Sequence, residues 1–249
     1  MRNLHLGTIG WSYNFWKGTF YPNTTASKDY LAYYGKRFDT VEVDSTFYHM
    51  PTQHTVANWK QQTPEAFVFS LKFPQSITHV KMLRDSQNET AAFLNKATLL
   101  GEKLGPLLLQ FPPNFDIKHL SNLADFLQKL PRPYRYVVEV RNKTLLTKDF
   151  YTLLEANKVA LAMTDSPQML HINEVTSDFL YIRWEGDRKR VKGTLGKIEA
   201  DKKSDLKTWV EQIKPFLEQK TPIFGYFGKY YSGYPPSDIA YVQGLTNIN

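Results

Sequence analysis

Residues 67–73 read Phe-Val-Phe-Ser-Leu-Lys-Phe, and aromatic or aliphatic side chains fill every odd position of this stretch. Successive side chains of a β-strand point to opposite faces. The four odd-numbered side chains therefore share one face, which we expect to pack on helices, while Val68, Ser70 and Lys72 share the other. The stretch predicts a strand that ends on a charged group at its second face.

Short apolar runs of this kind recur eight times along the chain, and helical spacing separates them. Alternating strands and helices indicate βα units and a parallel sheet. No Gly-x-Gly-x-x-Gly follows the first run, which disfavours a dinucleotide-binding fold. We therefore expect one domain over residues 1–249, a (β/α)8 TIM-like barrel whose later βα units can be irregular. The expected strands are 4–10, 39–44, 67–73, 106–111, 135–140, 158–163, 179–184 and 222–227.

The composition is that of a globular protein without a membrane span. The 249 residues are 42% hydrophobic and 22% charged, and the amino-terminal residues contain no long apolar segment. Cysteine is absent, which excludes disulfides, thiolate catalysis and cysteine metal sites. We expect a cytoplasmic protein with no membrane partner. The net charge of +7 favours anionic partners, although many soluble proteins carry such a charge for solubility alone.

Polar side chains fall late in most of the expected strands. In a barrel the carboxyl ends of the strands form the face that carries the active site. The sequence therefore predicts one polar pocket at this face. Its expected members at the strand ends are Glu42, Lys72, Gln110, Glu139, Asp165 and Arg183.

The carboxylates in this set allow two interpretations. Glu42 and Glu139, with Asp165 beside them, are candidate catalytic residues, because paired carboxylates with different surroundings suit general acid/base chemistry. The structural alternative is an ion network in which Lys72, Arg141 and Arg183 neutralise the carboxylates.

We expect a site without a cofactor, and the alternative is a site that binds a divalent metal ion. Glu42, Glu139, Asp165 and His79 offer oxygen and imidazole ligands that suit Mg²⁺, Mn²⁺ or Zn²⁺. No spaced His cluster exists, and the neighbouring cations compete for the carboxylates. We therefore expect no metal. His79 is instead a candidate for binding substrate or for a hydrogen bond to the backbone.

Basic residues in the same region suit an anionic ligand. Lys72, Arg141 and Arg183 can hold a phosphate or carboxylate, with Gln110 beside them. The segment 186–193 adds four cations after the seventh strand, where barrels often bind phosphate. The alternative for this segment is a solvated loop.

Aromatic side chains follow the first strand and lie in the eighth. Trp11 and Tyr13 open a ring-rich loop over residues 11–21, and Tyr226 belongs to the strand that closes onto the first. Flat rings beside polar groups suit stacking on a sugar or a base. The alternative is a hydrophobic plug beneath a long loop.

Several motifs of the chain resemble those of the YecE-like family, named domain of unknown function 72. The resemblance extends over essentially the whole chain in order. It implies a TIM-like barrel and no established activity. The motifs are Gly10–Pro22, Val41–Pro51, Ile77–His79, Lys103–Pro113, Glu139–Arg141 and Thr164–Pro167.

Two functions from different classes remain open at this point. The first is a metal-independent enzyme that acts on a small anionic or sugar-like substrate. The second is a protein that binds or processes nucleic acid through its basic loop and aromatic rings, and such binding weakens steeply with salt. Carboxylates interleaved with the cations repel a polyanion, which favours the enzyme.

Overall fold

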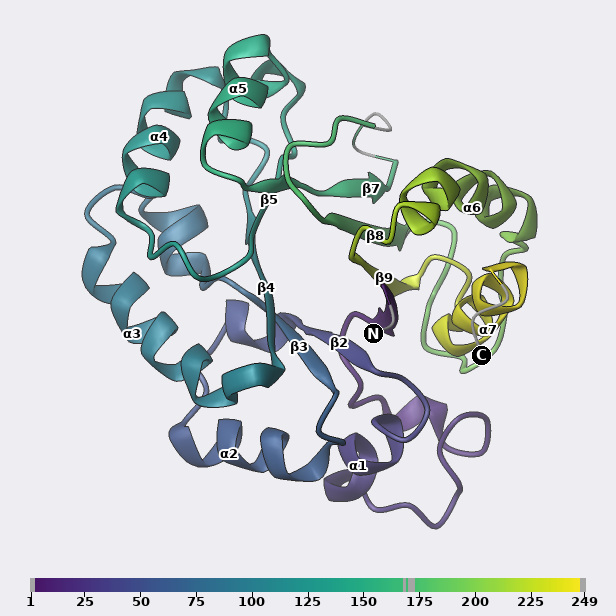
Figure 1. Cartoon of the computed structure of the whole chain (residues 1–249). Helices are drawn as coiled ribbons and strands as arrows, with labels where there is room; N and C mark the ends of the chain where they lie inside the picture. Colours follow the sequence, from purple (N-terminus) through teal and green to yellow (C-terminus); the bar gives the residue numbers. More distant parts are fainter. Residues whose placement is uncertain (1–2, 168, 170–172, 247–249) are drawn as a thin grey trace.

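The computed structural model describes residues 3–167, 169 and 173–246. Strands lie inside the molecule and helices surround them (Figure 1). Each of the eight expected strand regions contains a strand, and the sixth contains parts of two. The strands are β1 (Leu4–Thr8), β2 (Thr40–Val43), β3 (Val68–Lys72), β4 (Leu104–Gln110), β5 (Tyr136–Glu139), β6 (Ala160–Leu161), β7 (Met163–Asp165), β8 (Leu180–Gly186) and β9 (Ile223–Tyr230).

The strands form two parallel sheets, in the orders β1-β9-β8-β7 and β2-β3-β4-β5-β6. The expected sixth strand, 158–163, is interrupted at Ala162, so that β6 pairs with β5 while β7 pairs with β8. No continuous ladder joins the two sheets among the described residues. The fold is therefore a mixed α/β fold with two parallel sheets, and the expected closed barrel is not confirmed.

β1 and β2 approach each other closely where the two sheets meet. The Gly10 N–H donates a hydrogen bond to the Glu42 carbonyl at 2.8 Å. A Cβ atom on Gly7 would lie 2.1 Å from the carbonyl oxygen of Thr40. Glycine is the residue that fits so short a distance between backbones. Gly7 thus allows the amino-terminal strand to lie against β2.

Helices cover the outer faces of the sheets, and side-chain caps define where several of them begin. Thr52 Oγ1 accepts the Thr55 N–H at 3.1 Å before α2, and Thr147 Oγ1 accepts the Phe150 N–H at 3.3 Å before α5. Among the described residues no helix is long and apolar enough to cross a bilayer. The α-helices are α1 (Tyr30–Tyr34), α2 (Gln53–Gln62), α3 (Gln87–Ala97), α4 (Leu120–Lys129), α5 (Lys148–Ala156), α6 (Lys203–Glu218) and α7 (Pro235–Thr246).

Short helical turns connect many of these elements. The segment after β3 is a π-helix, which is a rare conformation often found near functional sites. The short turns are η1 (Asn14–Trp16), η2 (Ser27–Asp29), η3 (Asp44–Phe47), η4 (Ser76–Val80), η5 (Thr98–Lys103), η6 (Ile117–His119) and η7 (Lys143–Leu145).

Two hydrophobic clusters confirm the alternation expected for the strands. The larger cluster packs the sheets on the helices and contains Phe67, Phe69, Leu71 and Phe73. Val68 packs instead on the smaller cluster. The polar ends of the strands continue the face that carries this smaller cluster. Its members are Leu108, Val137, Ala160, Ala162, Phe179, Tyr181, Phe224 and Tyr226.

Candidate functional site

Arg183 on β8 links carboxylates from three strands. Its Nε and Nη2 donate to the two oxygens of Glu42 at 2.9 and 2.8 Å. Its Nη1 donates to both Glu139 and Glu185. The Arg183 side chain is only 4% exposed and that of Glu42 is fully buried. The expected convergence of the ends of β2, β5 and β8 is thus present.

Arg141 and Tyr181 complete this group. Arg141 donates from Nε to Glu139 at 2.9 Å and from Nη2 to Glu185 at 2.7 Å. The Tyr181 hydroxyl donates to Glu42 at 2.7 Å. Every carboxylate oxygen therefore accepts at least one hydrogen bond, as buried charges require. We call Glu42, Glu139, Arg141, Arg183 and Glu185 the buried ion cluster.

The surroundings of Glu139 hold it in the ionised form. Burial alone would raise the pKa of Glu139, but the guanidinium groups of Arg183 and Arg141 together lower it. Burial likewise opposes the charge of Arg183, and the nearby Glu139 and Glu42 raise its pKa. A carboxylate held ionised by two arginines is a poor proton donor at neutral pH. The positions of Glu42 and Glu139 suit the structural role of holding Arg183.

A cavity of about 740 Å³ lies beside the buried ion cluster at the carboxyl ends of the strands. Glu42 and Glu139 do not line it, whereas Arg183, Arg141 and Glu185 do. We call it the strand-end cavity. Seven of the expected site residues line it, namely Trp11, Tyr13, Lys72, His79, Gln110, Arg141 and Arg183.

Lys72 has a different environment from the arginines. Its Nζ donates to Gln110 Oε1 at 2.7 Å and lies 3.9 Å from the centre of the Phe47 ring. It forms no ion pair with any residue that the structure describes. Burial, reinforced by repulsion from Arg183, lowers the pKa of Lys72 to about 8. Lys72 is therefore not one of the cations that neutralise the carboxylates directly, as the ion-network interpretation had expected.

His79 lies on η4 and also contacts the Phe47 ring. The two ring centres are 4.8 Å apart with an edge-on orientation, and His79 Nδ1 lies 2.9 Å from Thr78 Oγ1. Burial, followed by repulsion from Lys72 and Arg141, lowers the pKa of His79 to about 4. The imidazole is therefore neutral at physiological pH.

The expectation that Asp165 belongs to the pocket is wrong. Asp165 does not line the strand-end cavity, and its Oδ2 accepts a hydrogen bond from Trp209 Nε1 on α6 at 3.0 Å. Alternation explains this position, because Asp165 shares a strand face with Met163, which packs in the large helix-facing cluster.

Tyr226 also lies outside the strand-end cavity, so stacking on a substrate is not available to it. Its ring is fully buried in the smaller hydrophobic cluster. Its hydroxyl lies 2.8 Å from Thr40 Oγ1 and 2.7 Å from Ser70 Oγ. Tyr226 therefore fills the space between the strands beneath the site.

Most of the aromatic loop forms the expected plug. Trp16 and Tyr21 are buried, and Phe20 packs on the same large cluster. Trp11 and Tyr13 are partly buried and line the strand-end cavity. Only these two of the loop's rings are thus available to a ligand in that cavity.

Several residues of the site were not selected from the sequence. Asp44, Phe47, Glu185 and Lys229 all line the strand-end cavity, and they are joined there by Arg188 of the basic segment 186–193. Two of them could have been found by alternation, because Asp44 follows Glu42 by two positions and Glu185 follows Arg183 by two. The contact of Phe47 with Lys72 joins two separate segments and has no signal in the sequence.

Comparison with known proteins places this chain in a family. A family model described as "Protein of unknown function DUF72" matches residues 5–249. The chain belongs to this family. The resemblance to YecE-like proteins that the motifs indicated is thereby confirmed.

Named relatives of this DUF72 chain occur in two well-known bacteria. The UPF0759 protein YecE of Escherichia coli K12 is 31% identical over 145 residues, which are 58% of this chain and 51% of that protein. The UPF0759 protein YunF of Bacillus subtilis 168 is 30% identical over 179 residues, 67% of this chain and 62% of that protein. The matches thus span about half to three-fifths of the length of these relatives.

Solved structures of DUF72 proteins share the fold. A DUF72 family protein from Thermotoga maritima has a TM-score of 0.82 and 25% identity, covering 98% of this chain and 99% of that chain. One from Enterococcus faecalis has a TM-score of 0.74 and 21% identity, with 100% and 99% covered. These names assign no activity.

The DUF72 chain does not gather the candidate metal ligands. Glu42 and Glu139 are paired with arginines, and Asp165 lies toward α6. Among the described residues, no three His, Cys, Asp or Glu side chains form a group that could hold a metal ion. The positions of these residues therefore favour ion pairing over metal ligation.

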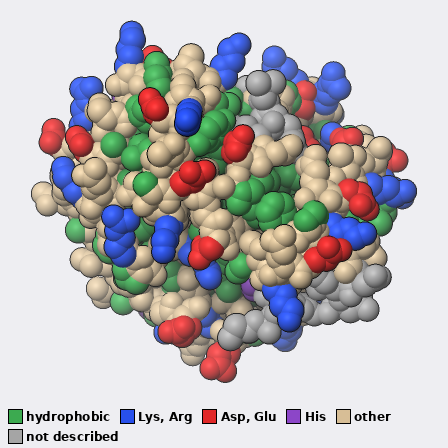
Figure 2. Space-filling view, turned by 45° about the horizontal axis from the view of Figure 1, so that its top comes forward, with side chains coloured by type: hydrophobic (Ala, Val, Ile, Leu, Met, Phe, Trp, Pro, Cys, Tyr) green, Lys and Arg blue, Asp and Glu red, His purple; other side chains and the backbone are tan. Residues whose placement is uncertain are grey.

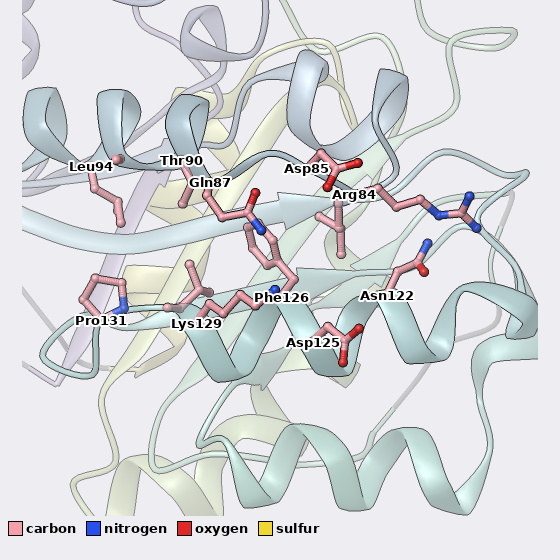
Figure 3. Close-up of a pocket in the computed structure, with 13 residues that line it drawn as sticks. Arg84, Asp85, Gln87, Thr90, Leu94, Asn122, Asp125, Phe126, Lys129 and Pro131 are labelled. Carbon is pink, nitrogen blue, oxygen red and sulfur yellow. The ribbon is translucent and has the colours of Figure 1, made fainter.

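A second cavity of the DUF72 chain, of about 420 Å³, lies on the outside of the fold (Figure 3). Thr90 and Leu94 of α3 face Phe126 and Lys129 of α4 across it. It contains none of the expected site residues. Among the described residues, charged groups from several separate strands line the strand-end cavity, which is therefore the better candidate for chemistry.

Proposed function

We propose that this DUF72 chain is a metal-independent enzyme that binds a small anionic or sugar-like substrate in the strand-end cavity. One observation carries the proposal. Lys72, Arg188 and Lys229 line this cavity without an ion pair to any described residue. Unpaired cations that converge on one cavity suit an anionic ligand.

Each of these three cations lies over an aromatic ring. Lys72 lies over Phe47, and the Arg188 guanidinium lies 5.0 Å from the centre of the Tyr230 ring. Lys229 Nζ lies 5.1 Å from the same ring. A ring orients a cation without neutralising it, so the positive charge remains available to a ligand.

The carboxylate best suited to acid/base chemistry is Asp44. It lines the strand-end cavity, is partly exposed and forms no ion pair with a described residue. Glu42 and Glu139, by contrast, have their oxygens occupied by arginines. In our proposal these two keep Arg183 in place, and Asp44 transfers protons. Trp11 and Tyr13 offer ring faces to a sugar-like substrate.

The proposal treats the two sheets as one TIM-like barrel. The strand order supports this, because β6 and β7 are consecutive pieces of one segment and β1 touches β2 through the Gly10–Glu42 hydrogen bond. In such a barrel the strand-end cavity lies at the face where active sites occur. A cytoplasmic location completes the proposal, since no cysteine is present.

Calorimetric titration tests ligand binding. The ligands are inorganic phosphate, glucose 6-phosphate and glucose at low ionic strength. We expect the two phosphates to bind and Lys229→Ala to weaken each by about five- to tenfold. Lys207→Ala, on the exposed side of α6, is the matched control and should bind as the wild type does. Absence of phosphate binding would refute the proposal.

Turnover is tested separately with a panel of phosphorylated aldoses and ketoses, whose conversion is followed by NMR. We expect one member to be converted by the wild type and not by Asp44→Asn. Equal conversion by both proteins would remove Asp44 from the mechanism.

Binding to single-stranded nucleic acid is the second candidate, and the structure favours it less. On the face shown in Figure 2, Lys and Arg side chains alternate with Asp and Glu and form no continuous basic track. Most rings of the aromatic loop are packed away. Titration with oligothymidylate at increasing salt separates the two functions, because binding to many phosphates weakens steeply with salt.

A further inference from the structure

Lys72 differs from the other cations of the strand-end cavity in its burial and its partner. It is buried, whereas Lys229 is partly exposed and Arg188 is exposed. Its Nζ donates to the neutral amide oxygen of Gln110 at 2.7 Å. A lysine used only to attract an anion gains nothing from such burial, because desolvation disfavours the ammonium form.

The environment of Lys72 increases the fraction of neutral amine. A pKa of about 8 leaves about half of the Lys72 side chains uncharged at pH 8, where an ordinary lysine is almost fully protonated. A neutral amine has a free electron pair and is a nucleophile. The hydrogen bond to Gln110 uses an N–H group and leaves that electron pair unengaged.

We propose that Lys72 forms an imine with the aldehyde or ketone group of a small anionic substrate whose acidic group is held by Lys229 and Arg188. This inference rests on the proposed function, since all three cations line the same cavity. It identifies the substrate class as a carbonyl compound that carries a phosphate or carboxylate.

The step balances without a further reagent. The electron pair of Nζ forms a bond to the carbonyl carbon, and the C=O π pair moves to oxygen, which takes a proton from the nitrogen. The resulting carbinolamine loses its hydroxyl and the second N–H proton as water, and a C=N bond forms. Hydrolysis reverses the sequence and releases the amine.

Phe47 supports the same step. Its ring centre lies 3.9 Å from Nζ. A protonated imine carries its positive charge at this nitrogen, so the ring face that contacts the ammonium can also contact the iminium ion. The ring further shields one side of the nitrogen from water.

Borohydride reduction tests the proposal, because it converts an imine into a stable secondary amine. The probes are pyridoxal 5′-phosphate, which has both an aldehyde and a phosphate, and pyridoxal, which has no phosphate. Protein and probe are mixed at pH 7.5, reduced with sodium borohydride, digested, and mapped by mass spectrometry. Lys207 serves as the internal control because it is an exposed lysine of α6.

We expect Lys72 to be the main labelled residue, on the order of 100-fold above Lys207, since a pKa of about 8 makes the neutral fraction of Lys72 larger than that of an ordinary lysine by about that factor. Pyridoxal should label Lys72 at least about tenfold less than its phosphate. Lys229→Ala should remove most of this difference. Labelling of Lys72 should rise with pH to a midpoint near 8. Lys72→Met should give no adduct at position 72. If this variant fails to fold, Lys72→Arg, which keeps the positive charge, serves in its place and should also give none.

Labelling of Lys72 at or below the level of Lys207 would overturn the proposal, and so would equal labelling by the two probes. The calorimetric titration with inorganic phosphate distinguishes this failure from failure of the proposed function. Phosphate binding without Lys72 labelling would leave the anion site intact and remove only the imine.

Discussion

Replacing Arg183 with methionine removes the guanidinium group at the centre of the buried ion cluster and leaves an unbranched apolar side chain in its place. The guanidinium group makes hydrogen bonds to Glu42, Glu139 and Glu185. Glu42 and Glu139 have side chains that are 0% and 2% exposed, so they have little access to water that could replace the lost partner. The variant is therefore left with buried carboxylates that have lost their main counter-ion.

The expected cost follows from this burial. Removing one member of a buried ion pair typically destabilises a protein by about 3–5 kcal/mol, because the remaining charge stays desolvated. Arg141 still reaches Glu139 and Glu185, whereas Glu42 keeps only the Tyr181 hydroxyl. We therefore expect Arg183→Met to lose about 3–5 kcal/mol of unfolding free energy, with most of the loss attributable to Glu42.

Urea denaturation at pH 7 measures this loss, with Arg190→Met as the matched control. The Arg190 side chain is 86% exposed, and its Nε lies 3.6 Å from Asp187 Oδ2. A surface ion pair of this kind contributes about 0–1 kcal/mol. The same chemical change should therefore have a small effect at position 190 and a large one at position 183.

The double variant Glu42→Gln/Arg183→Met refines the test. Removing the stranded carboxylate together with its arginine should restore about 1–3 kcal/mol relative to Arg183→Met alone. Two results would refute the reasoning. One is a loss below about 1 kcal/mol for Arg183→Met, and the other is a double variant that is less stable than Arg183→Met.

Three further predictions concern buried polar groups, and urea denaturation measures each. Because the arginines lower the pKa of Glu139 below 4.5, its stabilisation is present above that pH and is lost as pH falls through the lowered value; Glu139→Gln should abolish this part of the acid sensitivity. Burial raises the pKa of Asp238 from 3.8 to about 7, so the wild type loses up to about 4 kcal/mol between those values as pH rises, and Asp238→Asn should remove this loss; a parallel pH profile in the variant would contradict it. Tyr226→Phe removes the hydroxyl that Ser70 and Thr40 contact, although Thr40 still donates to the Val68 carbonyl, and should cost about 1–3 kcal/mol with phosphate affinity unchanged, whereas weaker phosphate binding would return Tyr226 to the site.

The positions of the strands and the faces of their side chains could be predicted from the sequence. Alternation in 67–73 correctly separated the helix-facing aromatic rings from Lys72. The same rule, continued through 160–165, would have corrected the one misplaced carboxylate. Ala160 and Ala162 belong to the smaller hydrophobic cluster, so Asp165 falls on the opposite, helix-facing side of the strand together with Met163. Asp165 lies two residues beyond the expected end of the strand at residue 163, and the alternation continues that far.

How far a residue lies from the end of its strand was harder to predict than the face of the strand to which its side chain points. The expected eighth strand ended at residue 227, which put Tyr226 close to the rim, but β9 continues to Tyr230. Tyr226 therefore lies in mid-strand, beneath the site. Strand ends depend on partners in the sheet, and β9 pairs with both β1 and β8. Sequence patterns fix such ends only to within a few residues.

Which cations are paired could not be predicted from the sequence at all, and this decides the chemistry. Lys72, Arg141 and Arg183 formed one equivalent set of candidates, yet the two arginines bind carboxylates whereas Lys72 binds an amide and a ring. The difference arises because a guanidinium group can join several carboxylates at once, while an ammonium group is a point charge. The arginines thus fix the ends of β2, β5 and β8 together. Lys72 lies beside the buried ion cluster, whose carboxylates are already paired with arginines. Its amino group is therefore left without a carboxylate partner among the described residues and is available to a ligand.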